Sequence, residues 1–278
     1  MVLKNKIDFL AIISAEKCNP NGDPMYGNRP RKDFEGHGIM TPECLKRKIR
    51  NRLQDAGEKI LVQSNDRIDD GHKSIKKRFE AFIKSEKIYK DPEELQKKTC
   101  SQWIDARSFG CIVPYKGTSK ESVTVGVRGP VSIGYATSID IVDIIDVMIT
   151  KSTNIENLDP GEKDTSTIGY KYIINKGAYV FFGSIYPDLA KRTGFTDEDA
   201  EKIKNAILTI FENDASHGRP SGSMMLSRLY WWVSPGLCSK IPPAQLFRSV
   251  HLSPSPEWPF FEDEYEAISG FEPEIYGI

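Results

Sequence analysis

The sequence predicts an α+β fold of the split βαβ, ferredoxin-like kind, interrupted by insertions. The run Ile7–Ala15 is short, apolar and β-branched, which indicates a buried strand, and an amphipathic helix follows it from Thr41. The aromatic-rich run Tyr172–Tyr186 is strand sequence, and the helix Thr196–Asn213 comes after it. A last strand is expected over Met224–Val233. This order of strands and helices is also the scaffold of RNA-recognition modules, whose sheet faces bind single strands.

Length and composition are those of a globular chain. The 278 residues, of which 39% are hydrophobic and 28% are charged, allow one large domain or two modest ones. With the insertions taken into account, we expect one domain over residues 1–278. The five cysteines form no CxxC pair and their number is odd, which disfavours a zinc site or a disulfide framework. The sequence contains no secretory signal and no membrane-spanning run. We therefore expect a cytoplasmic protein with no metal, no cofactor and no membrane partner.

The charges are distributed unevenly although the formal net charge is only −1. The segment Asn28–Arg52 holds eight Lys or Arg residues and three acidic ones. From Glu257 onward there are seven acidic residues and neither Lys nor Arg. Oppositely charged patches on one chain suit either a polyanionic partner or head-to-tail self-association.

The helix that begins at Thr41 carries much of the positive charge. Thr41 is a good N-cap, and Pro42 suits the first helical position. An apolar stripe faces inward, while Lys46 and Arg50 lie four residues apart on a neighbouring face, with Arg47 beside them. Most basic runs of this kind form a solvent-exposed helix face. We favour contact with RNA phosphates, because the helix starts directly after a glycine-rich loop.

That loop contains the motif NPNGDP over Asn19–Pro24. Its alternating Asn and Asp residues resemble the start of a calcium loop, but Pro24 stands where that loop needs glycine, and no glutamate follows at the required position. A plain cluster of turn residues is a second interpretation. We favour a phosphate-contacting loop. The residues expected to bind are Asn19, Asn21, Gly22, Asp23, Arg29 and Arg31.

Several segments fall outside the ferredoxin-like plan. Residues 58–99 are highly charged and helical in pattern, and they are expected to form an inserted helical lobe. Ile104–Val113 is expected to resume as a strand. Residues 150–170 are polar and predict an extended hairpin that leaves the core and returns. Residues 252–278 form an acidic, Pro-rich tail that is expected to wrap around the domain.

Other chemistry is weakly indicated. The sequence has no GxxxxGK[ST] or GxGxxG loop, no HExxH motif and no G-x-S-x-G elbow. His217 and Arg219 lie in the loop SHGRPSG, which could contact phosphate or could simply end a helix. Asp23 and Asp33 are the only carboxylates that we consider for metal-assisted phosphodiester cleavage. The aromatic residues of Tyr172–Tyr186 could stack on bases, although burial is the commoner fate of strand residues.

Several stretches resemble one family. These are the loop and helix NPNGDPMYGNRPRKDFEGHGIMTPECLKRKIRN, and later DARSFGCIV, VRGPVSIGYATSID and FTDEDAEKIKNAILTIFENDASHGRPSG. In this order they resemble the CRISPR-associated Cas-seven family of the RAMP superfamily, and most of all the Csd-type backbone subunit of the type I-C Cascade complex. The resemblance spans Ile7 to His251.

The resemblance implies an RRM-like palm, a helical finger lobe over residues 58–99 and a thumb hairpin over residues 150–170. It implies that several copies polymerise along the spacer of a CRISPR RNA, bind its sugar-phosphate backbone and present bases for pairing with target DNA in antiviral defence. The expected partners are the CRISPR RNA, target DNA, other copies of the chain and other Cascade subunits. Asn21, Asp23, Arg29, Arg31, Lys46 and Arg50 match positions that touch the guide RNA, with His217 and Arg219 in a loop less basic than the family's.

Two catalytic alternatives remain beside this non-enzymatic role. Some RAMP relatives cleave RNA with an aspartate in the loop after the first strand, so a metal-dependent endoribonuclease would use Asp23 or Asp33. Processing of the precursor guide would need a general base such as His37, for which no histidine partner is evident. We expect neither activity here.

Overall fold

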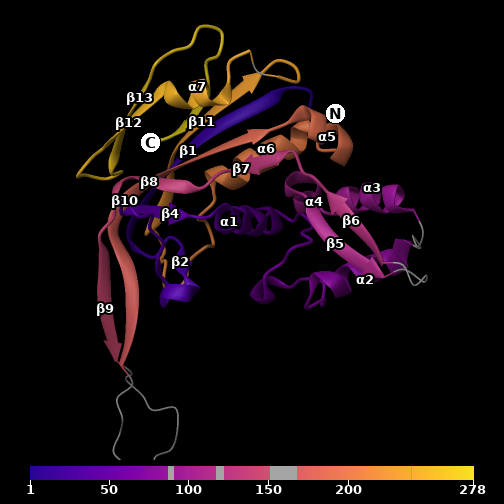
Figure 1. Cartoon of the computed structure of the whole chain (residues 1–278), viewed down its shortest axis with the longest axis horizontal. Helices are drawn as coiled ribbons and strands as arrows, with labels where there is room; N and C mark the ends of the chain where they lie inside the picture. The colour runs from indigo at the N-terminus through magenta and orange to yellow at the C-terminus, as the bar shows by residue number, and fades with distance from the viewer. Residues whose placement is uncertain (87–90, 117–121, 151–167, 239) are drawn as a thin grey trace, which may run out of the picture.

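The computed structural model describes residues 1–86, 91–116, 122–150, 168–238 and 240–278. Its fold is mixed α/β, built on an eight-stranded sheet in which neighbouring strands run antiparallel (Figure 1). The path through the sheet is β14-β11-β1-β10-β8-β4, and β7 and β9 also pair with β10. These strands are β1 (Lys6–Cys18), β4 (His37–Met40), β7 (Val131–Ile133), β8 (Ala136–Ile141), β9 (Ile144–Thr150), β10 (Ile168–Ile185), β11 (Met224–Ser234) and β14 (Glu274–Gly277).

The central strand β1 is buried on both of its faces. Phe9 and Ile13 belong to one apolar cluster, whereas Leu10 and Ile12 belong to another on the opposite side. Because successive side chains of a strand point to opposite faces, a strand covered on both sides needs a nearly continuous apolar run. The predicted strand over Ile7–Ala15 is therefore confirmed, and it is longer than expected.

Two helices, α1 (Pro42–Asp55) and α6 (Asp197–Leu208), pack on one face of the sheet. The hydroxyl of Thr41 accepts from the backbone N–H of Cys44, as the sequence predicted for an N-cap. Thr196 and Asp199 form a reciprocal capping box at the start of α6. The predicted helix over Thr196–Asn213 is too long, because after Leu208 the chain folds into successive turns, with the N–H of Glu212 donating to Thr209 O.

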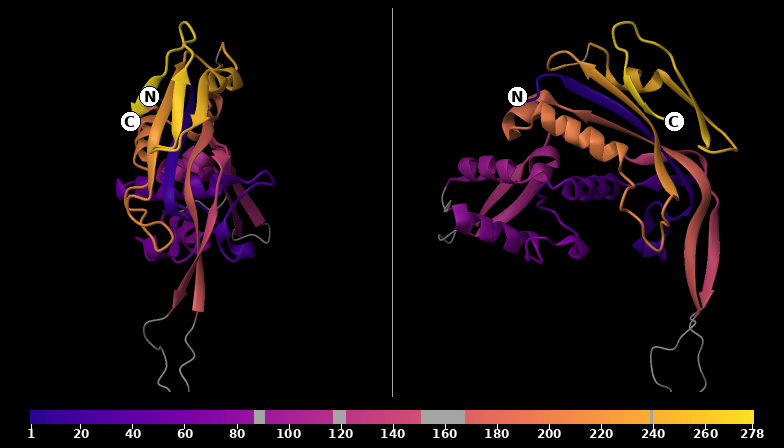
Figure 2. Two further views of the ribbon diagram at one scale, coloured as in Figure 1. Left: turned by 90° about the vertical axis from the view of Figure 1, so that its left-hand side faces the viewer. Right: turned by 180° about the vertical axis from the view of Figure 1, so that it is seen from behind.

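The C-terminal segment covers the opposite face of the sheet (Figure 2). It consists of α7 (Pro243–Arg248) and the hairpin of β12 (Val250–Pro254) and β13 (Phe261–Tyr265). Its apolar residues pack against Tyr230 and Trp232 of β11. The expectation that β11 would be the last strand is wrong, since β14 adds to the sheet beside it.

A separate lobe surrounds a second apolar cluster that includes Phe79 and Trp103. Its elements are η2 (Asn65–Arg67), α2 (Ile75–Glu86), α3 (Pro92–Gln102), α4 (Ile104–Phe109), β5 (Cys111–Lys116) and β6 (Ser122–Val127). The lobe thus extends past the predicted insertion over residues 58–99. The predicted strand over Ile104–Val113 is wrong for its first half. Asp105 is fully buried and accepts from the N–H of Leu61, which fixes α4 against the start of the lobe.

The strands β9 and β10 form a hairpin that projects away from the sheet (Figure 1). Its described part runs from the pair Ile144–Ile174 to the pair Thr150–Ile168. The thumb hairpin predicted over residues 150–170 lies largely outside the described residues, at 151–167. The hairpin and the helical lobe extend from the same side of the molecule, with α1 between them (Figures 1 and 2).

Among the helices that the structure describes, none is both long and apolar enough to cross a membrane.

Candidate nucleic-acid interface

The loop after β1 is held in one conformation by its own side chains. It contains β2 (Gly22–Asp23), the turn η1 (Pro24–Tyr26) and β3 (Arg29–Pro30), and β2 pairs with β3. Asp23 uses both carboxylate oxygens: one accepts from Met25 N–H at 3.0 Å and the other from Arg31 Nη1 at 2.9 Å. Gly22 is required, because a Cβ there would lie 2.0 Å from Asn28 Oδ1.

Two asparagines tie this loop to the elements around it. Asn21 Oδ1 accepts from the N–H of Thr41 at 2.9 Å, so the loop is joined to the N-terminus of α1. Asn19 is buried, and its backbone N–H donates to Gly218 O at 2.8 Å. The second predicted loop, with His217 and Arg219, therefore lies directly against the first. The sequence predicted each loop as a phosphate contact, and the fold brings them together from positions 199 residues apart.

Arg29 connects the loop to the base of the projecting hairpin. Its Nη2 donates to Asp146 of β9 at 2.6 Å, and its guanidinium lies 4.0 Å from the ring centroid of Tyr172 on β10. The hydrogen bond that Arg29 donates to Asp146 is the main reason that the pKa of Arg29 is raised. The side chain of Arg29 remains 42% exposed, and the guanidinium nitrogens that do not bond Asp146 could donate to a phosphate.

The cations of α1 do not form one solvent-facing row. Lys48 is buried and pairs with Asp214, which also accepts from Arg219 Nε at 3.0 Å. Burial is the main reason that the pKa of Lys48 is lowered. Arg50 donates to the buried Asp105 at 2.9 Å. These side chains attach α1 to the neighbouring loop and to the helical lobe.

Lys46 and Arg47 differ in what holds them. Arg47 Nη1 donates to Val62 O at 2.7 Å, which joins α1 to the lobe. Lys46 Nζ lies 5.8 Å from the ring centroid of Phe109 and has no ion pair within the described part of the chain. Burial, and then the nearby Arg50, lower the pKa of Lys46. Of the predicted basic residues of α1, Lys46 is the one whose ammonium is left to bind an anion.

The carboxylates considered for catalysis are occupied in the fold. Asp33 Oδ1 accepts from the backbone N–H groups of Glu35 and His37, so it stabilises a turn. Within the described residues, no group of three or more His, Cys, Asp and Glu side chains is placed to hold a metal ion. His37 Nδ1 lies 2.9 Å from Ser138 O. The geometry of these residues is that of turn and cap positions.

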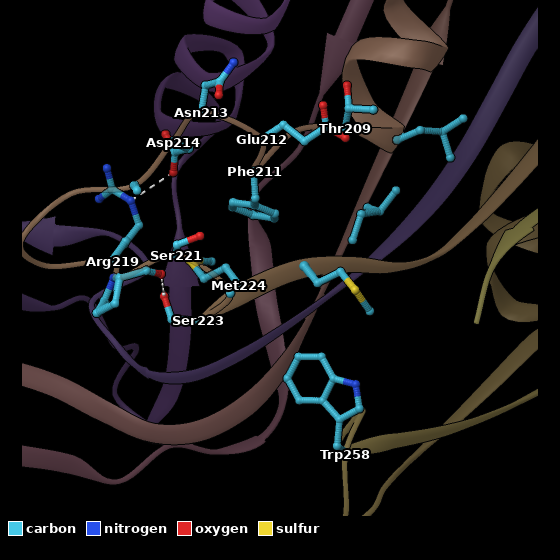
Figure 3. Close-up of a pocket in the computed structure, with 16 residues that line it drawn as sticks. Thr209, Phe211, Glu212, Asn213, Asp214, Arg219, Ser221, Ser223, Met224 and Trp258 are labelled. Atoms are coloured by element: carbon cyan, nitrogen blue, oxygen red, sulfur yellow. Dashed lines mark hydrogen bonds and ion pairs between the residues drawn. The ribbon is translucent and has the colours of Figure 1, made fainter.

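A cavity of about 480 Å³ lies beside the second loop (Figure 3). Phe211, Arg219 and Met224 line it, and Trp258 of the C-terminal segment stands on its other side. Trp258 is 42% exposed. This tryptophan was not among the predicted site residues, since a lone aromatic residue in a Pro-rich tail carries no pattern that points to a site.

Both faces of the central sheet are covered where single-strand binding was expected. Tyr179 and Phe181 are buried on the face that packs against α1 and α6. On the opposite face, under the C-terminal segment, the ring of Phe182 is 37% exposed and stacks on Phe247 with centroids 4.7 Å apart. The surface that remains consists of the two loops, the exposed side of Arg29 and Lys46. Cations in that arrangement suit a polyanion bound without sequence preference.

A family model described as CRISPR-associated protein Cas7 matches residues 5–272. The chain belongs to that family. The CRISPR-associated protein Cas7 of Haloferax volcanii is 24% identical over 231 residues, which are 78% of this chain and 67% of that protein. A chain of a solved CRISPR RNA-guided surveillance complex matches at a TM-score of 0.50 with 14% identity, over 91% of this chain and 77% of that one. A chain of a CRISPR RNA-guided surveillance complex in its pre-nicking state matches at a TM-score of 0.48 with 11% identity. The match covers 87% of this chain and 81% of that one.

The family model confirms the Cas7 family that the sequence motifs indicated. The match at a TM-score of 0.50 shows that this family member shares its mixed α/β fold, built on a large antiparallel sheet, with a chain of a CRISPR surveillance complex.

Proposed function

We propose that this chain is a backbone subunit of a CRISPR Cascade surveillance complex of type I-C. Membership of the Cas7 family over residues 5–272 carries the proposal. In this role several copies line up along the spacer of a CRISPR RNA together with other Cascade subunits. Each copy binds the sugar-phosphate backbone and leaves bases free to pair with target DNA, so that pairing and not the protein reads the sequence.

The proposed palm is ferredoxin-like and RRM-like. The strands β11, β1, β10 and β8 are neighbours in that order, and α1 and α6 pack on one face. The helical lobe corresponds to the fingers, and the hairpin of β9 and β10 corresponds to the thumb. Since α1 lies between the two projections, the guide would pass over the loops at its N-terminus.

Within this proposal the predicted RNA-binding residues take two roles. Lys46, Arg29 and Arg31 provide positive charge, and the exposed His217 adds donors next to the loop amides. Arg47, Arg50 and Arg219 act mainly by fixing the positions of α1 and the second loop through the contacts given above. Asn19, Asn21, Gly22 and Asp23 shape the first loop.

We further propose that the chain has no catalytic role. Both oxygens of Asp23 and one oxygen of Asp33 accept hydrogen bonds within their own loop. A metal-dependent nuclease would need these carboxylates to face a phosphodiester. Incubation of the purified chain with guide RNA, complementary RNA and Mg²⁺ should leave both strands intact. Regular cuts that Asp33→Ala or Asp23→Ala abolishes would contradict this part of the proposal.

The charge of Lys46 gives the direct test of RNA binding. Lys46→Ala should weaken binding of guide RNAs of different sequence by a similar factor, because the contact is with phosphate. It should also reduce the salt dependence, by about 0.7 in the slope of log K against log salt for each lost contact with a single strand. The measurement is an RNA titration by fluorescence anisotropy at several salt concentrations.

The matched control is Lys4→Ala. Lys4 is an exposed lysine, and it precedes β1 at the end of that strand away from the loop. Thirteen strand residues separate the two ends by roughly 40 Å. An unchanged salt slope for Lys46→Ala, or an equal loss for Lys4→Ala, would contradict the proposed path of the RNA.

A further inference from the structure

A second basic surface lies where the helical lobe meets the palm, far from the two loops. It is a pocket of about 530 Å³ between α3, α4, the short helix α5 (Pro187–Thr193) and α6. Five of the residues that line it are cationic and two are anionic: Lys97, Arg107, Lys191, Arg192, Lys202, Glu198 and Asp199. We call this the basic pocket.

Both carboxylates of the basic pocket are already neutralised. Arg107 binds the two oxygens of Asp199 at 3.0 and 2.7 Å. Glu198 pairs with Lys202 at 2.7 Å. Burial alone would raise the pKa of Asp199, but its hydrogen bonds from Arg107 hold the pKa below the usual value. The pocket therefore has no carboxylate left for its remaining cations.

Those remaining cations face open solvent. Lys97 and Arg192 are exposed and have no ion pair or side-chain hydrogen bond within the described residues. Lys191 approaches only Asp188, at 3.9 Å, and both side chains are more than half exposed. The hydroxyl of Thr193, in the pocket wall, is buried and has no partner within the described part of the chain. The pocket is thus ready to accept an anionic group.

A matching acidic surface lies on β13 of the same chain. Glu262 and Glu264 are exposed and alternate along the strand, so both point away from the sheet. Neither has an ion pair within the described residues, and the facing strand β12 contains no Lys or Arg. Their attachment points are roughly 7 Å apart, two residues along a strand. We call this the acidic face.

A hydrogen bond to β11 holds the strand β13, which carries the acidic face, in place. Asp263, between the two glutamates, accepts from Arg228 Nε at 2.8 Å, which anchors β13 to β11. A preorganised pair of carboxylates loses little conformational freedom when it meets a partner. The acidic face therefore has the rigidity expected of a docking surface.

The two surfaces lie on opposite sides of the molecule. Figure 1 shows β12 and β13 at one end of the long axis, and α3 and α5 toward the other, and the view from behind in Figure 2 agrees. A surface and its complement on opposite sides of one chain form a heterologous contact, which repeats from copy to copy. Neither surface includes the loops assigned to the guide RNA.

We propose that the acidic face of one copy docks in the basic pocket of the next. This inference rests on the proposed function, in which copies of the chain line up along the guide RNA, and it assigns the charged contact between them. Glu262 and Glu264 would pair with Lys97 and Arg192. The net charge of −1 for the whole chain means that neighbouring copies do not repel each other strongly.

Charge reversal on each surface tests the inference. The two variants are Lys97→Glu with Arg192→Glu, and Glu262→Lys with Glu264→Lys. All four side chains are exposed, so both variants should fold. Each variant alone should need about ten times more protein than the wild type to fill a guide RNA that holds several copies, because like charges would meet at every contact. Mass photometry measures the assemblies.

Mixing the two variants should restore assembly to the wild-type range. A copy with a reversed pocket can accept the reversed face of the other variant, and their unchanged surfaces also match. The two variants should therefore alternate along the RNA. The control pair Lys73→Glu with Lys77→Glu, at two exposed lysines at the start of α2, should assemble as the wild type does.

Other outcomes overturn the inference in distinguishable ways. Wild-type assembly by both reversal variants, or a mixture no better than either alone, would reject the docking contact but not the proposed function. Weaker binding of the pocket variant to an RNA long enough for only one copy, without rescue by the face variant, would show that the pocket binds nucleic acid instead. Failure of the wild-type chain to bind or assemble on guide RNA would reject the proposed function and the inference with it.

Discussion

The first loop and the helix α1 both contain basic residues, but the fold uses them differently. In the loop, the side chain of Arg29 stays 42% exposed even though it pairs with Asp146. On α1, Lys48 is 3% exposed and Arg50 is 13% exposed, each paired with an aspartate from another element. The difference teaches that a basic run in a sequence shows where charge is, whereas only the fold shows which acid neutralises it.

The largest loss of stability should come from removing Asp105, the aspartate that pairs with Arg50 of α1. Asp105→Ala would leave Arg50 without its partner and two backbone N–H groups, of Leu61 and Val62, without an acceptor. Breaking a buried charged network of this kind costs about 3–5 kcal/mol of unfolding free energy. Urea denaturation measures it. Asp188→Ala, at a carboxylate that is 65% exposed, should cost less than about 1 kcal/mol. Equal losses would mean that Arg50 is not held by Asp105.

A smaller loss of stability should follow from removing Asp214, which pairs with Lys48 of the same helix. Asp214→Ala leaves Lys48 buried without its carboxylate, which should cost about 3 kcal/mol. It also frees Arg219 and hence the second loop. The double variant Lys48→Met with Asp214→Ala should regain part of that loss, because no charge is left buried. A double variant less stable than Asp214→Ala would show that Lys48 has another role.

The loop should respond in RNA affinity more than in stability. Gly22→Ala places a Cβ 2.0 Å from Asn28 Oδ1 and 3.0 Å from Asn28 O, so the Asn28 side chain must move and the backbone there must shift slightly. We expect about ten-fold weaker guide binding, which corresponds to about 1.4 kcal/mol. Gly126→Ala is the control, since its added methyl group would meet no atom within 4 Å beyond its chain neighbours. An RNA titration and a thermal melt on both variants separate the two effects. Unchanged affinity would mean that the shape of the loop is irrelevant to binding.

Local sequence patterns were sufficient to predict the elements whose structure depends on residues close to them in the chain. The N-cap Thr41 and the capping box at Thr196 lie in short motifs whose partners are three residues away. The strand β1 was recognisable because both of its faces are buried. The motif NPNGDP indicated a phosphate-contacting loop, which stays a prediction.

What the sequence could not show depends on distant contacts. Asp105 belongs to a helix because its carboxylate binds the backbone at Leu61, 44 residues earlier. The pairing of Lys48 with Asp214 spans 166 residues, and neither position signals the other. The C-terminal segment was expected only to wrap around the domain, yet its aromatic residues complete a core against β11. Such contacts have no period that a local pattern can reveal.

The C-terminal segment that covers β1 and β11 is synthesised after both strands. The residues that cover one side of β1 and β11 come after position 240, so the ribosome makes them after both strands. Until they arrive, Leu10, Tyr230 and Trp232 have no protein atoms over them. An unfinished chain would therefore present an adhesive aromatic surface that chaperones recognise and that a finished chain hides. The strands β12 and β13 thus complete the cover of this face only after β11 has been made.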